Sequence, residues 1–453
     1  MEGRYWERAM EPLRVGMLGL GTVGGGVARL LSGEGERIAR RAGRPIQLTT
    51  IVVRDPKRPR AIAPPPGTRL TDDPRAVLDN PELDVVVEVA GGIEPARGWM
   101  MAALRNGKDV VTANKALLAE HGADLMAEAG RTGRALAFEA SVGGGVPVIH
   151  ALTVALTANR VDALAAILNG TCNSILTEMT ESGRSYRDAL ALAQAQGFAE
   201  ADPTLDVDGT DTAHKLAILA WLAFDHRIGP ASIPRRGIDT LDELDLRFAA
   251  ELGYAVKLLA WAERREGTVA PRVAPTLVKR GTPLAEIRGP FNAIRIVGDA
   301  VGEVVLTGQG AGASPTASAV VGDLIDVATG RARLTTRFLA SPPSAVPSRT
   351  ASAQVVDAAI QDPRRRHYLR FGILDQPGVL GRIALILGQH GISIASVIQH
   401  DPGEKLPEDS GEVVVPLVVM THLARESALE RALEQIDRLD CVRAPSLQLP
   451  VLD

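Results

Sequence analysis

The sequence has little cysteine, little excess charge and no long apolar run. Its two cysteines, Cys172 and Cys441, are too few for a framework of disulfide bonds. No apolar stretch reaches the roughly 18–20 residues that a membrane-spanning helix needs. Residues 1–12 lack the apolar core of a secretion signal. We therefore expect a cytoplasmic protein with no role in a membrane.

The charges nearly cancel. Fifty Lys and Arg residues oppose 54 Asp and Glu residues, and the formal net charge of −4 favours binding neither to nucleic acid nor to anionic lipid. The one basic run, Arg364–Arg366, is typical of a solvated linker. Hydrophobic residues make up 45% of the chain, as in folded globular proteins, and a length of 453 residues suggests about three domains.

Short apolar strands alternate with helices in the first third of the chain. Strand-like stretches such as RVGMLGL (14–20) and IQLTTIVVRD (46–55) are separated by helical segments. This alternation predicts an α/β fold with a parallel sheet covered on both faces, a Rossmann-type domain over residues 13–138. Residues 307–335, a glycine-rich turn and an alanine-rich helix, are expected to complete that domain.

The pattern changes after residue 138. Residues 139–306 mix strands and helices and predict a second, α+β domain. Residues 336–365 are rich in proline and serine and are interpreted as a linker. Residues 366–453 predict the order strand, helix, strand, strand, helix, strand, which is that of a ferredoxin-like domain.

The segment GLGTVG matches the dinucleotide-binding pattern G-x-G-x-x-G. Gly19 would permit the tight turn, Gly21 would let the backbone approach a pyrophosphate, and Gly24 would allow close packing of helix on strand. The pattern follows a strand and opens a helix, which is the context that the motif requires. We expect NADP or NAD to bind here.

The second strand carries conflicting signals for the choice of dinucleotide. Asp55 could accept a hydrogen bond from a ribose hydroxyl, as in NAD-binding sites. Arg54, Lys57 and Arg58 could instead neutralise the 2′-phosphate of NADP. We favour NADP or the use of both.

Three later segments end predicted strands, where ligands of doubly wound sheets bind. They are EVAGG (88–92), TANK (112–115) and EASVGGGVPV (139–148). Lys115 would begin a helix at such a position, although a cation is unfavourable at a helix N-terminus, and this points to a functional role. The third segment could bind substrate or a cation, or could be a hinge between domains.

The acidic stretch ADPTLDVDGTDTAHK (201–215) precedes an apolar helix. It lacks the Cys and His ligands of a structural zinc site and the closing Glu of an EF-hand. Asp211 and Lys215 stand four residues apart and share a helix face. An exposed ion pair is one interpretation. A buried lysine oriented by Asp211 is the other, and it would suit the proton transfer that accompanies oxidation of an alcohol.

Several segments together resemble the homoserine dehydrogenases. They occur in the family's order over residues 13–335: GLGTVGGGV, EVAGGIEPA, VTANKALLA, FEASVGGGVPVI, ILNGTCNSIL and GFAEADPTLDVDGTDTAHKL. The segment ILDQPGVLGRIALILGQHGISIASV (373–397) resembles an ACT domain, as in the long bacterial forms, although Ser393 stands where many relatives have Asn. The resemblance implies reversible NAD(P)-dependent interconversion of L-homoserine and L-aspartate 4-semialdehyde.

The resemblance also implies roles for individual residues. Lys215 would donate and accept the proton, supported by Asp211, and Lys115 would lie beside the nicotinamide and substrate. Glu200 and Asp206 would contact the substrate. The implied cofactor-binding residues are Gly19, Leu20, Gly21, Thr22, Val23, Gly24, Arg54, Ala90, Gly91, Lys115 and Gly310. A monovalent cation, sodium or potassium, would be held by Glu139, Val142, Gly144 and Val146. Residues 139–306 would also form a homodimer or homotetramer, and the ACT domain would bind a small amino acid, with threonine as the first candidate.

Two other functions are weighed against this one. A semialdehyde dehydrogenase would need a cysteine nucleophile, for which Cys172 is the candidate, although no histidine is obviously paired with it. An amino-acid sensor would use the ACT domain and keep the nucleotide-binding fold as a scaffold. The intact set of Lys, Asp and Glu residues argues against that second alternative.

Overall fold

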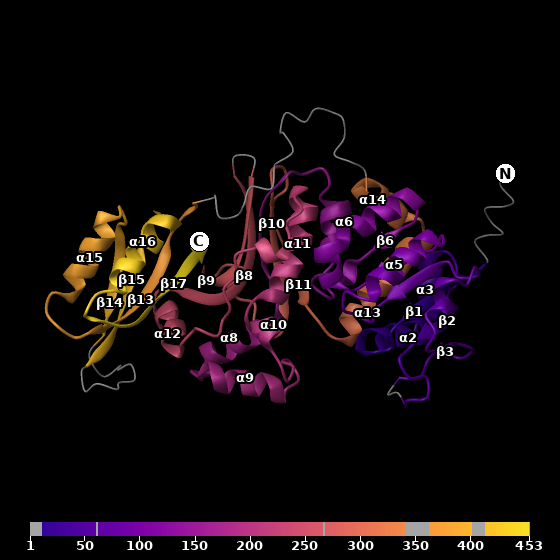
Figure 1. Cartoon of the computed structure of the whole chain (residues 1–453), viewed down its shortest axis with the longest axis horizontal. Helices are drawn as coiled ribbons and strands as arrows, with labels where there is room; N and C mark the ends of the chain where they lie inside the picture. The colour runs from indigo at the N-terminus through magenta and orange to yellow at the C-terminus, as the bar shows by residue number, and fades with distance from the viewer. Residues whose placement is uncertain (1–10, 60–61, 266–267, 341–361, 401–412, 453) are drawn as a thin grey trace.

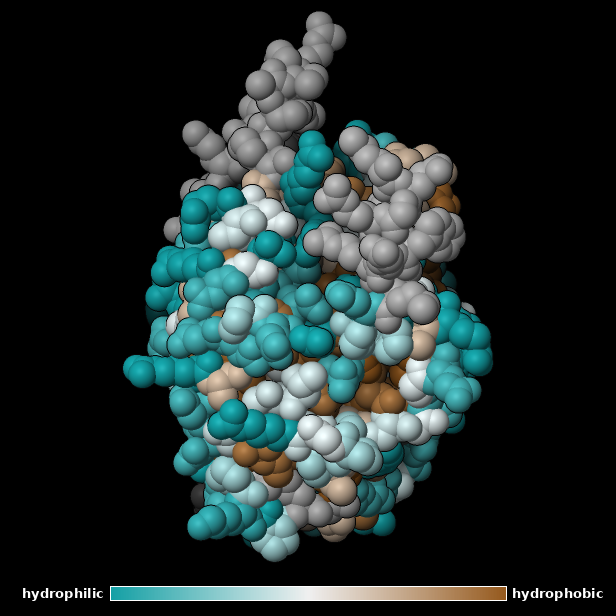
Figure 2. Space-filling view, turned by 90° about the vertical axis from the view of Figure 1, so that its right-hand side faces the viewer, coloured by the Kyte–Doolittle hydropathy of each residue, from teal (hydrophilic) through white to brown (hydrophobic). Residues whose placement is uncertain are grey.

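The computed structural model describes residues 11–59, 62–265, 268–340, 362–400 and 413–452. Three domains follow one another along the long axis of the molecule (Figure 1). Within the described ranges no helix combines the length and the apolar character that crossing a membrane would require. At the Rossmann end of the molecule, hydrophilic side chains cover most of the face (Figure 2).

The N-terminal domain is built on one parallel six-stranded sheet. Its strand order β3-β2-β1-β4-β5-β6 is that of a Rossmann fold. The elements, in chain order, are β1 (Leu13–Leu18), α2 (Thr22–Gly33), α3 (Gly35–Ala42), β2 (Ile46–Val52), β3 (Arg69–Thr71), α4 (Arg75–Leu78), β4 (Val85–Glu88), α5 (Ala96–Arg105), β5 (Asp109–Thr112), α6 (Lys115–Thr132) and β6 (Leu136–Ala137). The central strands are almost wholly apolar because helices cover both faces of the sheet.

The chain returns to this domain after the middle domain. Helices α13 (Ala313–Ala328) and α14 (Arg331–Ala340), orange among indigo and purple elements in Figure 1, pack beside α2 and α6. A Cβ on Gly26 would lie 2.6 Å from the carbonyl oxygen of Ala313, so glycine in α2 permits the close approach of α13. The Thr336 hydroxyl accepts a hydrogen bond from the amide of Leu136 and so fastens α14 to β6.

The middle domain packs helices on an antiparallel sheet. Its elements are η1 (Glu139–Ser141), α7 (Val148–His150), η2 (Ala151–Ala155), β7 (Val161–Ile167), α8 (Gly170–Ser182), α9 (Tyr186–Ala195), α10 (Thr204–Val207), α11 (Thr210–Phe224), η3 (Pro230–Ser232), α12 (Glu243–Glu251), β8 (Tyr254–Arg265), β9 (Thr268–Lys279), β10 (Phe291–Gly298) and β11 (Gly302–Gln309). Helix α11 is almost wholly buried, and its apolar residues join those of the sheet in one core.

The C-terminal domain has the ferredoxin-like order expected for residues 366–453. It consists of β12 (Arg364–Arg365), β13 (His367–Leu374), α15 (Val379–Gln389), β14 (Ile394–Gln399), β15 (Val414–Thr421), β16 (Ala424–Arg425), α16 (Glu426–Ile436) and β17 (Val442–Leu452). Strand β17 also pairs in parallel with β9, at Val451 with Leu277 and Leu452 with Val278. The strands of the middle and C-terminal domains thus form one nine-stranded sheet, a continuity that the sequence did not predict.

Three expected boundaries differ from the structure. Residues 364 and 365, which the sequence analysis assigns to a solvated linker, form β12, because they pair with β16. Residues 336–340, which the sequence analysis assigns to the linker, complete α14, because their helix packs on α6. Residues 307–309, which it assigns to the Rossmann domain, end β11, because they pair with β10. Residues 341–361 of the expected linker lie outside the described residues.

Candidate active site

The glycine turn before α2 has the shape that the dinucleotide pattern requires. Gly19 has φ +105°, a conformation that favours glycine. A Cβ on Gly24 would lie 2.4 Å from the carbonyl oxygen of Gly19, so this glycine lets helix and turn pack closely. A Cβ on Gly21 would meet nothing within 4 Å, which leaves open space beside the backbone. The first turn of α2 carries no acidic residue, so the turn fits a pyrophosphate at a helix N-terminus.

Glu88 organises the ends of β4 and β5, a role that the sequence analysis missed. Its fully buried carboxylate accepts hydrogen bonds from the amides of Ala90 and Gly91, at 2.9 and 3.0 Å, and from the Thr112 hydroxyl at 2.8 Å. The two expected cofactor residues Ala90 and Gly91 are therefore held by one buried acid. The sequence does contain a signal for this role, because a glutamate at the end of an otherwise apolar strand needs buried hydrogen-bond partners.

Asn114 then starts α6 beside the same loop. Its side-chain oxygen caps the helix by accepting from the Leu117 amide, while its nitrogen donates to the Gly92 carbonyl at 2.6 Å. These contacts fix the backbone immediately before Lys115. The expected position of Lys115, at a strand end and a helix start, agrees with the structure.

Two lysines share one carboxylate at the centre of the site. Lys215 Nζ donates to Asp211 Oδ2 at 2.7 Å and to the Leu168 carbonyl at 2.7 Å. Lys115 Nζ lies 2.6 Å from the other oxygen of Asp211, Oδ1. Asp211 and Lys215 are 6% and 8% exposed, so the interpretation as an exposed ion pair is wrong.

The pKa values of the two lysines move in opposite directions. Burial lowers the pKa of Lys215, and this outweighs the opposing effect of Asp211. Burial also acts to lower the pKa of Lys115, but Asp211, Asp206 and Glu200 together raise it above its usual value. Burial acts to raise the pKa of Asp211, yet Lys215 and Lys115 hold it below its usual range. Of the two lysines, Lys215 is therefore the easier to deprotonate.

The acidic stretch divides into structural and site-facing residues. Asp202 accepts from the amide and the hydroxyl of Thr204 and so turns the loop. Asp208, to which the sequence analysis gave no role, accepts the corresponding bonds from Thr210 at the start of α11. Asp206 and Glu200 lie close enough to Lys115 to stabilise its charge.

Asn169 and Asn292, which sequence reasoning did not single out, line the lysine site. Asn169 donates to Asp206 at 2.8 Å and to Asp211 at 3.0 Å. Asn292 donates to the same Leu168 carbonyl that Lys215 uses, at 3.2 Å. A Cβ on Gly310 would lie 2.1 Å from Asn292 Cγ. Packing against Asn292 is therefore a reason for glycine at this expected cofactor residue.

Cys172 has a structural position. Its buried thiol donates to the Asp206 carbonyl at 3.2 Å. Burial and the neighbouring carboxylates Asp206 and Asp211 raise the pKa of this thiol well above its usual value. Because a nucleophilic cysteine must form a thiolate readily, the structure disfavours the semialdehyde dehydrogenase alternative.

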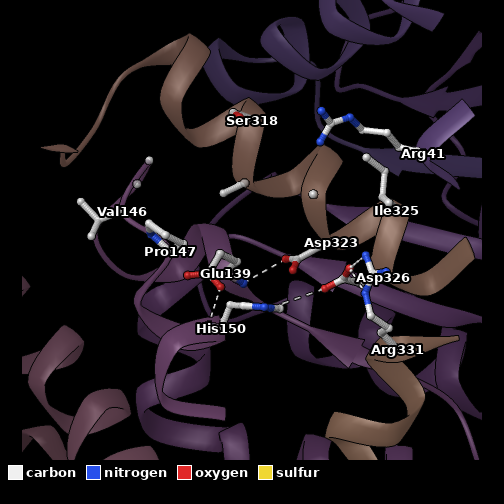
Figure 3. A pocket seen from close by; sticks show the side chains of 14 residues that line it. Arg41, Glu139, Val146, Pro147, His150, Ser318, Asp323, Ile325, Asp326 and Arg331 are labelled. Carbon is white, nitrogen blue, oxygen red and sulfur yellow. Dashed lines mark hydrogen bonds and ion pairs between the residues drawn. The ribbon is translucent and has the colours of Figure 1, made fainter. Parts of the chain in front are cut away.

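A pocket of about 540 Å³ lies beside the expected cation residue Glu139 (Figure 3). The Glu139 carboxylate accepts from the amides of Ile149 and His150, at 2.9 and 2.7 Å, and its own amide donates to Asp323. Burial is the main cause that raises the pKa of Glu139 to about 7. The other expected residues, Val142, Gly144 and Val146, are buried in the following loop.

Known proteins match this chain over all three domains. Residues 147–325 match the family described as homoserine dehydrogenase, residues 19–139 match the NAD-binding domain of that family, and residues 367–441 match the ACT domain. Homoserine dehydrogenase of Pseudomonas aeruginosa is 42% identical over 446 residues, which cover 98% of this chain and 99% of the relative. The chain belongs to the homoserine dehydrogenase family.

Solved homoserine dehydrogenases have the same architecture. The enzyme from Thiobacillus denitrificans superposes with a TM-score of 0.85 at 42% identity, covering 98% of this chain and 99% of that one. A homoserine dehydrogenase from S. aureus superposes with a TM-score of 0.74 at 31% identity, with the same coverage. The expected family, fold class and enzyme class are confirmed. The roles of the individual site residues stay predictions.

Proposed function

We propose that this chain catalyses the reversible NAD(P)-dependent oxidation of L-homoserine to L-aspartate 4-semialdehyde, a reaction of threonine and methionine biosynthesis. The observation that carries the proposal is the shared carboxylate of Asp211, which holds one lysine charged and leaves the other able to lose its proton. Alcohol oxidation needs such a proton acceptor, placed among groups that bind a charged substrate.

Each residue then has one task. Neutral Lys215 takes the proton of the homoserine hydroxyl, while Asp211 and the Leu168 carbonyl fix the direction of its amine. A bound nicotinamide would supply the hydride acceptor. Lys115 remains cationic and stabilises negative charge on the substrate oxygen. In the reverse reaction, protonated Lys215 returns the proton to the developing alkoxide.

Glu200 and Asp206 supply the negative charge that an α-ammonium group needs. Both act electrostatically on Lys115, and this supports an ammonium site next to the proposed chemical centre. Each is open enough to reach a ligand, with Glu200 exposed and Asp206 partly buried. A substrate that is both amino acid and alcohol matches this arrangement.

We propose a preference for NADP over NAD. Asp55 Oδ1 accepts from the Lys57 amide at 2.9 Å, so this carboxylate stabilises its own turn. Arg54 and Lys57 are exposed at the end of β2, where a 2′-phosphate would lie. Arg54→Ala should raise the KM for NADP and leave that for NAD nearly unchanged. Equal effects on both would contradict the preference.

The cation site stays a proposal supported by charge. Among the described residues no lysine or arginine forms an ion pair with Glu139, and burial already disfavours its charged form. Sodium or potassium would offset that charge, with backbone oxygens of Val142, Gly144 and Val146 as further ligands. Thermal unfolding with sodium, potassium or a large organic cation as the chloride salt tests binding directly. Glu139→Gln should abolish any stabilisation specific to a metal ion.

Regulation is proposed through the ACT domain and assembly through residues 139–306. It would bind a small amino acid, threonine first, and the chain would form a homodimer or homotetramer in the cytoplasm. Inhibition assays with threonine test the first point, and light scattering of the purified protein tests the second. A variant lacking residues 366–453 that keeps full sensitivity to threonine would remove the ACT domain from regulation.

The decisive test of the main proposal is direct. Purified protein should reduce NADP or NAD when homoserine is added, read as absorbance at 340 nm. Absence of a change with both cofactors would overturn the proposed function.

A further inference from the structure

Asn169 joins the two halves of the proposed site. It lies between the end of β7 and the start of α8, with 4% of the residue exposed. Its side-chain oxygen accepts from the Cys172 amide at 2.8 Å, which caps α8. This bond orients the amide group, because it fixes which side carries the nitrogen. The nitrogen consequently points at Asp206 Oδ1 and Asp211 Oδ2, at 2.8 and 3.0 Å.

The two acceptors have different proposed tasks. Asp206 belongs to the group that binds the substrate ammonium, and Asp211 orients Lys215. Asp211 Oδ2 accepts from Asn169 and from Lys215 Nζ together, so the oxygen that locates the amine is itself located by Asn169. One amide, with two donor hydrogens and no charge, thus sets the spacing of the two carboxylates.

Capping of α8 does not account for this residue. Serine or aspartate would cap a helix about as well as asparagine. Serine, however, cannot reach both carboxylates, and aspartate would add a third acid beside them. The feature that only the amide supplies is the pair of donated hydrogen bonds, of which the bond to Asp211 is buried and the bond to Asp206 partly buried. Unpaired acceptors are costly in such a place.

We propose that Asn169 is a positioning residue that holds the ammonium-binding carboxylate and the lysine-orienting carboxylate at a fixed separation. The inference rests on the proposed function and deepens it. Asn169 touches neither the reacting atoms nor the cofactor in this proposal. It acts through Asp206 and Asp211, so that substrate binding and proton transfer are set by the same contact.

Two variants separate positioning from capping. Asn169→Ser keeps a cap on α8 and removes the bridging amide. Asn169→Asp also keeps a cap but adds a carboxyl group beside two others, where its pKa should be high. The matched control is Ser185→Ala, which removes the cap of α9, where Ser185 accepts from the Asp188 amide. Thermal unfolding, binding of NADPH by fluorescence, and kcat and KM for homoserine across pH are measured for all.

Asn169→Ser should fold and bind NADPH like the wild type while kcat/KM for homoserine falls roughly 10- to 100-fold, with both kcat and KM affected. Asn169→Asp should lose activity more steeply with rising pH than the wild type, because only its protonated carboxyl can donate a hydrogen bond. Ser185→Ala should lower stability alone. If Asn169→Ser does not fold, the pH profile of Asn169→Asp decides.

The outcomes distinguish the two proposals. Full activity of Asn169→Ser, within about twofold of an active wild type in kcat and KM, would overturn the role of Asn169 and leave the proposed function standing. A pH profile of Asn169→Asp parallel to that of the wild type would do the same. A wild-type protein without homoserine turnover would overturn the proposed function and this inference with it.

Discussion

Replacing Lys215 with methionine removes the proposed proton acceptor and little else. Methionine is unbranched and has nearly the length of lysine, so it can fill the same space in α11. Asp211 would keep Lys115 at Oδ1 and Asn169 at Oδ2. The carboxylate therefore retains a cation and a neutral donor, and the structure around it should persist.

The size of the expected loss follows from the role. General acid–base catalysis contributes typically 10²- to 10⁴-fold, which corresponds to about 3–5 kcal/mol of activation free energy. The stability cost should be smaller than the ~3–5 kcal/mol for breaking an isolated buried pair, because Lys115 continues to neutralise Asp211. We therefore expect kcat to fall at least 100-fold while the protein stays folded.

Homoserine oxidation is followed at 340 nm, with NADPH binding measured in parallel by fluorescence. Lys108→Met is the control, since Lys108 is also buried but precedes β5, at the opposite end of the sheet from the site. Lys108→Met should keep its turnover. Small primary amines should restore part of the turnover of Lys215→Ala, whose shorter side chain leaves space for them. A Lys215→Met variant with more than about a tenth of the wild-type kcat would refute the role of Lys215.

Three further predictions concern stability. Burial lowers the pKa of His367 to about 3, below its ordinary 6.5, so the unfolded chain binds the proton first. The contribution of His367 to the free energy of unfolding is complete above pH 6.5 and is lost as pH falls toward 3, by as much as about 4 kcal/mol. Urea unfolding at pH 7 and 4.5 should therefore show a weaker pH dependence of stability for His367→Asn than for the wild type. A Cβ on Gly310 would lie 2.1 Å from a neighbouring amide carbon, so Gly310→Ala should lower the free energy of unfolding in urea by about 1–3 kcal/mol. The control is Gly381→Ala, which has open space at its Cβ and should be neutral or slightly stabilising. Asp245→Ala leaves Arg370 without the buried carboxylate that accepts two of its N–H bonds, and calorimetry should show a loss of about 3–5 kcal/mol; an unchanged unfolding transition would contradict this role.

Much of the fold could be predicted from local patterns in the sequence. The glycine turn lies in six residues, 19–24, that carry their own conformational preferences, and Gly19 does adopt a positive φ. The pairing of Asp211 and Lys215 follows from helical spacing, and their burial from the apolar residues of α11. Each of these signals acts over a single turn or a single helix.

Other contacts join distant segments and leave no local signal. Asn169 bonds to residues 37 and 42 positions later, and Asn292 lies 124 positions from the Leu168 carbonyl. The pairing of β9 with β17 brings together strands from two domains. Such pairings depend on how complete helices and strands pack against one another, and a single sequence does not reveal them.

The Lys115–Asp211 contact crosses from the Rossmann domain to the catalytic domain, since Lys115 begins α6 and Asp211 lies in α11. Any separation of the two domains, such as one that admits or releases a dinucleotide, would withdraw the positive charge of Lys115 from Asp211. Asp211 would then act on Lys215 alone, and the pKa of Lys215 would rise. Contact between the two domains therefore favours the neutral form of Lys215, which is the form that can accept the proton of an alcohol.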